Sequence, residues 1–444
     1  MSGVCIENSL TEIEQIMKSI SIYIHIPFCV KKCQYCDFLS APADSRAQEV
    51  YLRALKQEIR EQAARYREYE VQTVFIGGGT PTAVPCEKLC EVLKTVFTCY
   101  RVNPQAEISM EANPGTVTKE TLLSYRKAGI NRISIGLQSA DDGELKLLGR
   151  IHTYRDFLQT YRWAQEAGFT NINLDIMSAL PGQSVEKYKK TLETVLSLKP
   201  QHISAYSLIV EEGTPFYEKY GQESEKLQAT GEKQPDLPSE EEEREMYALT
   251  EKLLAAAGYH RYEISNYALP GRECRHNRVY WKRGNYVGFG LGAASMVENV
   301  RFENTREMQE YLAEYAGVQG TEEVSAEVTQ GDEQALSNEQ EFSLCEDTHS
   351  ENAQEFSIRE NVHPLSQQEQ MEETMFLGLR LTEGVSKAEF HQQFGISMEQ
   401  IYGEVIRKNT AKGLLIDEAG YVRLTREGMD LSNYVMAQFL LDEV

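Results

Sequence analysis

Three cysteines lie within eight residues near the start of the chain, at Cys29, Cys33 and Cys36. The chain has nine cysteines in all, an odd number that does not suit a disulfide framework. A structural zinc site usually takes four ligands in two paired groups, and the sequence has no second Cys-x-x-Cys pair. Three thiolates in one loop can instead bind three irons of a [4Fe–4S] cluster and leave the fourth iron open to an exchangeable ligand. The spacing therefore predicts an iron–sulfur centre, with zinc or buried free thiols as the alternatives.

Other residues that could bind a small polar ligand come at the ends of apolar runs. The string Gly77-Gly-Gly-Thr80 follows one such run, and its missing side chains let the backbone approach a ligand closely. Its spacing differs from the G-x-G-x-x-G of a dinucleotide-binding loop. Glu111, Gln138 and Asp175 also fall at or near the ends of expected strands. Ligand sites in barrels lie at these carboxyl ends, so these residues are expected to share one site.

Six short β-branched or apolar runs alternate with six amphipathic stretches between Ser21 and Leu208. This alternation predicts repeated βα units and a parallel sheet, curled into a partial (β/α)6 TIM-like barrel of the α/β class. A complete barrel would need two further units, which the sequence does not show before residue 211. Strands are expected at Ile22–His25, Thr73–Ile76, Glu107–Met110, Arg132–Ile135, Asn171–Ile176 and His202–Ser207. Helices are expected at Ala47–Arg67, Cys86–Tyr100, Lys119–Ala128, Asp142–Leu148, Tyr154–Ala167 and Val185–Leu198.

The remainder of the chain has a different pattern. Tyr247–Tyr315 is expected to hold one helix and a region rich in Gly and Tyr. Residues 371–444 predict a mainly helical, winged-helix-like domain, in which three helices precede a β-hairpin. The expected helices are Met371–Leu379, Ser386–Phe394 and Met398–Lys412, and the hairpin strands are Leu415–Asp417 and Tyr421–Leu424.

The net charge of −23 is concentrated in two stretches, with −8 within residues 211–246 and −12 within residues 318–370. Such runs are typical of solvated surface inserts, and the alternative is an acidic arm that docks a basic partner. The acidity argues against a protein whose main partner is nucleic acid, because phosphates would repel it. The expected organisation is an N-terminal segment (1–20), the barrel (21–210), an acidic insert (211–246), an extension (247–317), a second acidic insert (318–370) and the C-terminal domain (371–444).

The sequence also bears on location. It contains no apolar run long enough for a membrane span, and residues 1–20 lack the apolar core of a secretory signal. Unpaired cysteines in a long chain without such a signal are typical of a reducing compartment. We therefore expect a cytoplasmic protein that is not integral to a membrane.

The Cys-x-x-x-Cys-x-x-Cys string, with Tyr35 before its last cysteine, resembles the radical S-adenosylmethionine (SAM) superfamily. The resemblance implies that Cys29, Cys33 and Cys36 hold a [4Fe–4S] cluster whose open iron binds SAM. It also implies a reductant, such as flavodoxin or ferredoxin, that supplies an electron to the cluster. The residues expected around these two cofactors are Tyr23 beside the cluster, Gly78, Gly79 and Thr80 at the methionine part of SAM, and Glu111, Gln138, Arg150 and Asp175 at its carboxylate, ribose and neighbouring groups.

Longer strings resemble the HemN/HemW branch of that superfamily, which contains oxygen-independent coproporphyrinogen III oxidases and haem chaperones. They include Tyr23–Cys29, Glu111–Gly115 and Asp175–Gly182. Three features favour the chaperones. The oxidases have a fourth cysteine where this chain has Phe38. They also have a long N-terminal extension, whereas only about 20 residues precede the first expected strand here. The string His276-Asn-x-x-Tyr280-Trp281 looks like a motif of the chaperones.

The resemblance to the chaperones implies haem as a further cofactor and a haem-accepting apoprotein, such as a respiratory haem protein, as partner. His276 is the candidate axial ligand, with Tyr280 and Trp281 packed on the macrocycle. The alternative for His276 is a hydrogen-bonded histidine in an aromatic cluster. A related pattern has a histidine where this chain has Ala294, so that second candidate ligand is missing. The alternative function is the oxidative decarboxylation of coproporphyrinogen III propionates to vinyl groups.

Overall fold

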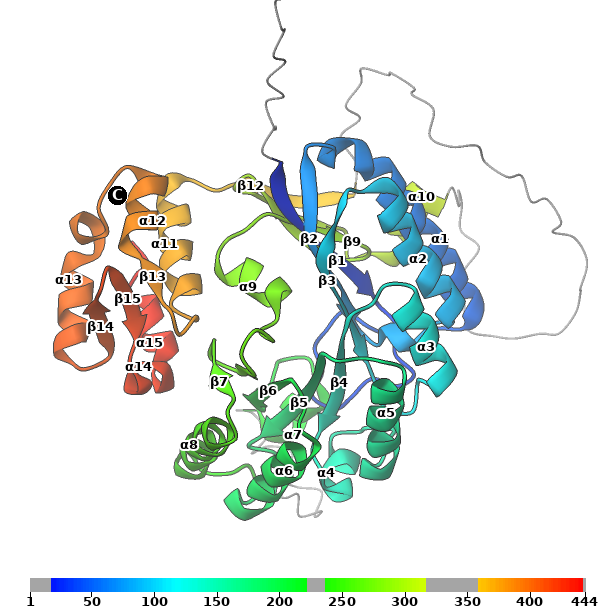
Figure 1. Cartoon of the computed structure of the whole chain (residues 1–444), viewed down its shortest axis with the longest axis horizontal. Helices are drawn as coiled ribbons and strands as arrows, with labels where there is room; N and C mark the ends of the chain where they lie inside the picture. The colour runs from blue at the N-terminus through cyan, green and yellow to red at the C-terminus, as the bar shows by residue number, and fades with distance from the viewer. Residues whose placement is uncertain (1–16, 222–235, 317–357, 442–444) are drawn as a thin grey trace, which may run out of the picture.

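The computed structural model describes residues 17–221, 236–316 and 358–441 (Figure 1). Its first part contains six parallel strands, each followed by one or more helices, as expected for a partial (β/α)6 barrel. The strands are β1 (Lys18–Ile26), β2 (Tyr69–Gly78), β3 (Val102–Ala112), β4 (Arg132–Gln138), β5 (Ile172–Ser178) and β6 (His202–Ser207). The helices are α1 (Ser45–Gln62), α2 (Cys86–Cys99), α3 (Lys119–Lys127), α4 (Asp142–Leu147), α5 (Tyr154–Glu166) and α6 (Val185–Leu198), with short 3-10 turns η1 (Ala63–Tyr66) and η2 (Pro81–Ala83).

Strand β1 shows how the sequence divides the two faces of the barrel sheet. Ile20, Ile22, Ile24 and Ile26 are buried in the hydrophobic core that includes residues of α1. The residues between them face the other way: the Tyr23 hydroxyl contacts the His25 ring of the same strand, and the Tyr23 ring packs near Phe75 of β2. Because side chains alternate along a strand, one segment builds the core and also presents polar groups to the barrel interior.

The sheet extends beyond the six barrel strands on both sides, in the order β12-β11-β10-β9-β1-β2-β3-β4-β5-β6-β8-β7. Strand β9 pairs in parallel with β1, and β8 pairs antiparallel with β6. The prediction of a single helix in Tyr247–Tyr315 was wrong, because the structure has three helices and five short strands there. Strands of two to five residues are too short to show a clear alternation in the sequence. These elements are α8 (Glu240–Ala256), β7 (His260–Arg261), β8 (Asn266–Ala268), α9 (Arg275–Trp281), β9 (Tyr286–Phe289), β10 (Ala294–Val297), β11 (Val300–Asn304) and α10 (Met308–Ala316).

Parts of both acidic stretches are folded. In 211–246 the structure has α7 (Pro215–Tyr220) and the start of α8, where Ser239 caps the helix and Phe216 and Met246 are fully buried. The four glutamates of the first turn of α8 suit the positive end of the helix dipole. In 318–370 the structure has β12 (Arg359–Pro364), which pairs with β11. Residues 222–235 and 317–357 lie outside the described part of the chain.

The C-terminal domain has the expected order of three helices followed by a hairpin, and it has its own hydrophobic core. A short strand joins the hairpin in a three-stranded sheet of order β13-β15-β14, which completes the winged-helix arrangement. The elements are α11 (Gln367–Gly378), β13 (Val385–Ser386), α12 (Lys387–Phe394), α13 (Met398–Ala411), β14 (Leu415–Glu418), β15 (Tyr421–Leu424), α14 (Arg426–Asp430) and α15 (Ser432–Ala437). In Figure 1 this domain lies to one side of the barrel, with α9 between the two.

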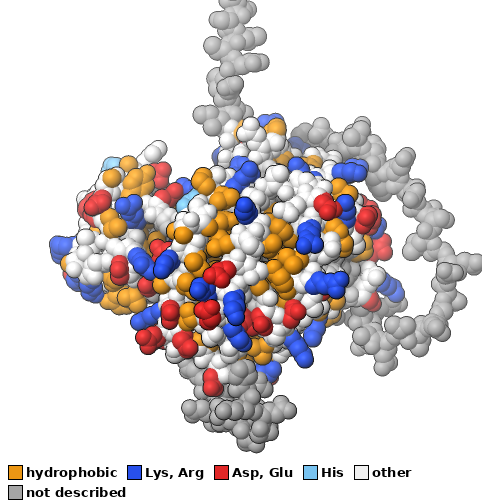
Figure 2. Space-filling view, turned by 60° about the horizontal axis from the view of Figure 1, so that its bottom comes forward, with side chains coloured by type: hydrophobic (Ala, Val, Ile, Leu, Met, Phe, Trp, Pro, Cys, Tyr) orange, Lys and Arg blue, Asp and Glu red, His pale blue; other side chains and the backbone are white. Residues whose placement is uncertain are grey.

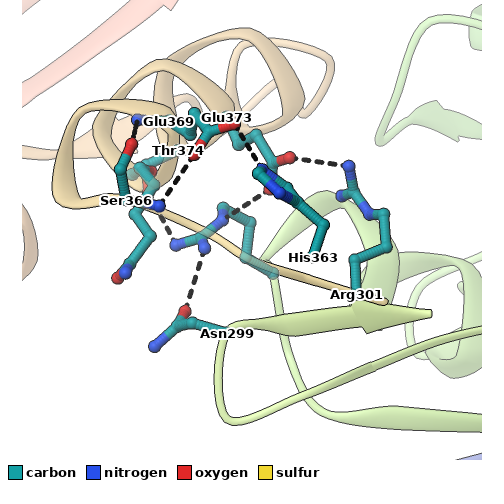
Figure 3. Close-up of polar contacts among 9 residues, drawn as sticks. Asn299, Arg301, His363, Ser366, Glu369, Glu373 and Thr374 are labelled. Carbon is teal, nitrogen blue, oxygen red and sulfur yellow. Dashed lines mark hydrogen bonds and ion pairs between the residues drawn. The ribbon is translucent and has the colours of Figure 1, made fainter. Parts of the chain in front are cut away.

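An ion-pair cluster joins α11 to the extension of the barrel sheet (Figure 3). Glu373 pairs with Arg283 at 3.1 Å and with Arg301 at 2.8 Å, and Arg283 also donates to Asn299. The side chains of Arg283 and Glu373 are only 3% and 7% exposed. A buried pair with satisfied hydrogen bonds favours one geometry, so it holds the C-terminal domain in place.

Candidate functional site

The three motif cysteines lie in the loop that follows β1, at the carboxyl end of the barrel strands. The loop folds back on itself, because the Cys29 N–H donates to the Ala41 carbonyl and Phe28 forms a bridge with Ala41. All three side chains are half-buried. Burial raises the pKa of the Cys36 thiol.

Two residues from other parts of the chain contact the sulfurs. Thr80 Oγ1 is 3.5 Å from Cys29 Sγ, and an Arg150 N–H donates to Cys33 Sγ at 3.6 Å. Among the described residues, no three His, Cys, Asp or Glu side chains converge as ligands of one metal ion. The thiolates of a four-iron cluster bind separate irons and need not converge. A half-buried loop with three thiols and a guanidinium partner therefore fits a cluster.

The glycine string after β2 lies directly against this loop. Gly78 has φ +114°, and a Cβ there would come within 2.6 Å of the His25 ring. A Cβ on Gly79 would come within 2.6 Å of the Phe28 carbonyl oxygen and 3.0 Å of Cys29 Sγ. Only glycine fits at these two positions, so the sequence there is set by the close approach of the backbone to the cysteine loop.

Two buried carboxylates, Glu111 and Asp175, lie near this string and interact electrostatically. Glu111 accepts a hydrogen bond from the Gly78 N–H, and burial together with Asp175 raises the pKa of Glu111 to about 8. Burial also raises the pKa of Asp175, which accepts hydrogen bonds from Asn173 and Ser134. A cationic ligand bound here would favour the ionised form of Glu111. The pair is therefore suited to a positively charged ligand.

Arg150 and Gln138 complete this end of the barrel. Arg150 donates to Asn113 Oδ1 at 2.7 Å and to the Gly136 carbonyl, while Gln138 has φ +70° and accepts from the Tyr206 hydroxyl. A non-glycine residue at positive φ carries strain, which is often stored at functional sites.

The structure brings together the expected residues from β1 to β5 and adds others. Asn113 links Thr80 to Arg150, because its amide donates to Thr80 Oγ1 at 2.8 Å. It lies two residues after Glu111, on the same face of the strand end, a spacing that could have indicated it. His25 was also missed. Its ring binds the Tyr23 hydroxyl and the Leu39 carbonyl, so Tyr23 meets the cysteine loop through His25.

His276 lies inside the barrel on α9, at 1% exposure. Its Nδ1 is 2.7 Å from Thr73 Oγ1, its Nε2 is 2.8 Å from the Tyr280 hydroxyl, and its ring stacks on Phe75. Burial lowers its pKa to about 3. Both ring nitrogens are engaged, so His276 could ligate an iron only after breaking one of these bonds. The geometry is that of the alternative, a hydrogen-bonded histidine in an aromatic cluster.

Helix α9 is held by a carboxylate from the barrel. Glu107 on β3 accepts from the backbone N–H groups of Arg275 and His276, and Cys274 Sγ lies 3.7 Å from it. Burial raises the pKa of the Cys274 thiol to about 12. Cys274 is therefore a buried structural thiol in this arrangement.

Trp281, at the end of α9, faces a different environment from His276. It lines a groove of about 670 Å³ between α9 and the C-terminal domain, and the Arg380 guanidinium lies 4.3 Å from its ring centre. Its indole N–H is buried and has no hydrogen-bond partner within the described residues. The motif His276–Trp281 thus has one end in the barrel and the other in the groove. Ala294 is exposed at the start of β10.

Family models match two parts of the chain. A model of the radical SAM superfamily matches residues 23–195, and a model of the HemN C-terminal domain matches residues 365–431. The structure of coproporphyrinogen III oxidase (HemN) from Escherichia coli has a TM-score of 0.74 and 21% identity, and covers 96% of this chain and 91% of that one. This likeness shows the fold. The barrel, the cysteine loop and the C-terminal domain therefore define a radical SAM protein, as expected.

Curated relatives narrow this class. Heme chaperone HemW of Bacillus subtilis (strain 168) is 36% identical over 95% of this chain and 99% of that protein. Heme chaperone HemW of Escherichia coli (strain K12) is 39% identical over 63% of this chain and 70% of that protein. The chain belongs to the HemW family of the radical SAM superfamily, which confirms the resemblance seen in its motifs. In the described ranges, no helix is long and apolar enough to cross a bilayer.

Proposed function

We propose that this protein is a haem chaperone that binds a [4Fe–4S] cluster, SAM and haem, and passes the haem to an acceptor protein. The observation that carries the proposal is the 36% identity, over nearly the whole of both chains, to a protein named as a haem chaperone. Phe38 agrees with it, because an exposed phenylalanine stands where the oxidases are expected to have a fourth cysteine.

The barrel residues would act on the two cofactors as follows. Cys29, Cys33 and Cys36 would ligate the cluster, and Arg150 would hold Cys33. Gly78, Gly79 and Thr80, which pack directly against the cysteine loop, would flank the methionine part of SAM. Glu111, Gln138, Arg150 and Asp175 would orient its polar and charged groups, and Tyr23 would brace His25 against the glycine string. When bound, the cluster and SAM supply one-electron chemistry. In a chaperone they would serve to regulate haem transfer rather than to drive radical turnover.

The haem would lie in the groove beside Trp281. Haem has a flat apolar ring with two carboxylates, and the groove offers aromatic surface from Trp281 and from Tyr421, which is exposed. Arg423 offers positive charge to a haem carboxylate, whereas Lys282 is already paired with Glu383. The phenol of Tyr421 is a side chain that can ligate ferric iron. His276 would then position α9 through its contacts with Thr73 and Tyr280.

A haem titration followed by absorbance tests this proposal. The wild type should bind haem saturably, Trp281→Ala should bind at least ~10-fold more weakly, and Phe97→Ala, an exposed aromatic on α2, should match the wild type. His276→Ala should leave the position of the Soret band unchanged, because both ring nitrogens of His276 are engaged by Thr73 and Tyr280. Absence of saturable binding by the wild type would overturn the function.

The decarboxylase alternative is tested in parallel. Reconstituted protein is incubated anaerobically with SAM, a reductant and coproporphyrinogen III, and products are measured. The chaperone proposal expects no protoporphyrinogen and no substrate-dependent 5′-deoxyadenosine. Formation of either product in stoichiometric excess over protein would establish the enzyme instead.

A further inference from the structure

Exposed apolar side chains surround the cysteine loop. Val30 and Phe38 in the loop are 57% and 64% exposed, and Ile151, which follows Arg150, is 48% exposed. Val30 and Ile151 line the same opening as Cys33 and Arg150, so they form the rim of the cluster site. Single exposed apolar residues are common, but several around one functional opening indicate an interaction surface.

Positive charge accompanies this apolar rim. Lys31 and Lys32 lie in the loop between the first two cysteines, both are exposed, and neither forms an ion pair within the described residues. Arg306 approaches the loop from the other side, near Leu39 and His25. Asp37 is the acidic residue between the last cysteine and Phe38. A locally cationic face stands out on a chain whose net charge is −23.

The fold restricts where an electron can enter. The helices α1 to α6 cover the outside of the barrel strands, whereas the cysteine loop is half-buried at the carboxyl ends of those strands (Figure 1). Figure 2, which brings the bottom of the Figure 1 view forward, shows hydrophobic side chains gathered over the middle of that face, with both basic and acidic side chains around them. Because electron transfer falls off steeply with distance, a donor must bring its redox group to the loop.

We propose that Val30, Phe38, Ile151, Lys31 and Lys32 form the docking face for an acidic electron-donor protein. The donor loses one electron and a cluster held by the loop gains it, passing from the 2+ to the 1+ state, with no bond made or broken. Opposite charges would steer the encounter, and the apolar rim would exclude water from a small interface typical of transient redox complexes. This proposal rests on the cluster of the proposed function but not on haem binding.

The test compares Lys31→Glu/Lys32→Glu with Lys94→Glu/Lys127→Glu, which makes the same charge change on α2 and α3. Reduced flavodoxin, an acidic donor, and dithionite, a small reductant, are each mixed with reconstituted protein, and bleaching of the cluster is followed by stopped flow. Binding of oxidised flavodoxin is measured separately by calorimetry. In the loop variant we expect binding and reduction by flavodoxin to weaken at least ~10-fold and to lose their salt dependence. Reduction by dithionite should stay unchanged, as should all values of the control variant.

Three results would overturn the proposal. They are unchanged flavodoxin binding in the loop variant, an equal loss in the control variant, and a loss of haem transfer without any loss of reduction, which would assign the face to haem or its acceptor. If the double variant fails to hold its cluster, Phe38→Ser and Lys31→Gln are measured in its place, and unchanged flavodoxin binding by both has the same meaning. Haem binding by the wild type is measured independently, so failure of the chaperone proposal can be told apart from failure of the docking-face proposal.

Discussion

At the residue scale, the site depends on side chains that hold one another from different strands. Arg150 contacts Cys33 and Asn113, Asn113 contacts Thr80, and Thr80 contacts Cys29. This chain of contacts joins the cysteine loop to the carboxyl ends of β2, β3 and β4. The position of the cysteine loop is therefore tied to the ends of these three strands.

Cys33→Ala tests the cluster assignment. Removal of one of three thiolates leaves an iron without its protein ligand, so we expect loss of the oxygen-labile brown chromophore and of bound iron. Iron and sulfide analysis with absorbance measures this, and Cys90→Ala, on α2, serves as a control. A full four-iron cluster in Cys33→Ala would contradict the assignment.

Glu111 gives a pH prediction for the ligand-free protein. Its folded pKa is raised from 4.5 to about 8. Its contribution to stability is therefore fully present below its unfolded pKa and is lost as pH rises through about 8. The unfolding free energy of the wild type should therefore fall between pH 6 and pH 8.5 by at least ~1 kcal/mol more than that of Glu111→Gln. Urea unfolding at both pH values measures the difference, and a parallel response of the two proteins would argue against the raised pKa.

At the element scale, two carboxylates decide how α9 and α11 sit against the barrel. Glu107 on β3 accepts hydrogen bonds from the first backbone N–H groups of α9. Glu373 on α11 pairs with Arg283 and Arg301 of the barrel extension. Each carboxylate therefore binds an element that lies far from its own in the sequence. The groove beside Trp281 has walls from α9 and the C-terminal domain, so its shape depends on these two contacts.

Glu373→Ala tests the contact between α11 and the barrel. It leaves the Arg283 guanidinium buried without its partner, so unfolding free energy should fall by about 3–5 kcal/mol. Glu404→Ala, which breaks an exposed pair with Lys408 on α13, should cost no more than about 0.5 kcal/mol. Chemical denaturation measures both variants. Equal effects would show that the buried pair does not hold the domain.

At the scale of the whole molecule, the charge is distributed unevenly. Most of the net charge of −23 comes from 211–246 and 318–370, whereas every proposed cluster and SAM ligand lies outside them. The two family models, which match residues 23–195 and 365–431, also leave out all of 211–246 and most of 318–370. The charge of the molecule is thus largely separate from its cofactor chemistry.

Replacement of residues 322–351 by a Gly-Ser linker tests this separation. We expect an unchanged cluster content and an unfolding midpoint within about 2 °C of the wild type, because the described site and the two largest hydrophobic cores lie elsewhere. Iron analysis and thermal unfolding measure these values. Loss of the cluster in this variant would show that the acidic stretch supports the site.

The sequence alone determined the six βα units, the cysteine loop and the strand-end carboxylates, and it indicated the winged-helix order. These features depend on local spacing, since side-chain periodicity and turn residues act over a few positions. The place of His276 is different. Its ring binds Thr73, which lies 203 residues earlier, and no local pattern encodes that pairing. The parallel contact of β9 with β1 and the burial of Glu373 against Arg283 have the same cause. The tertiary structure decided these, because only folding brings distant segments together and removes water from between them.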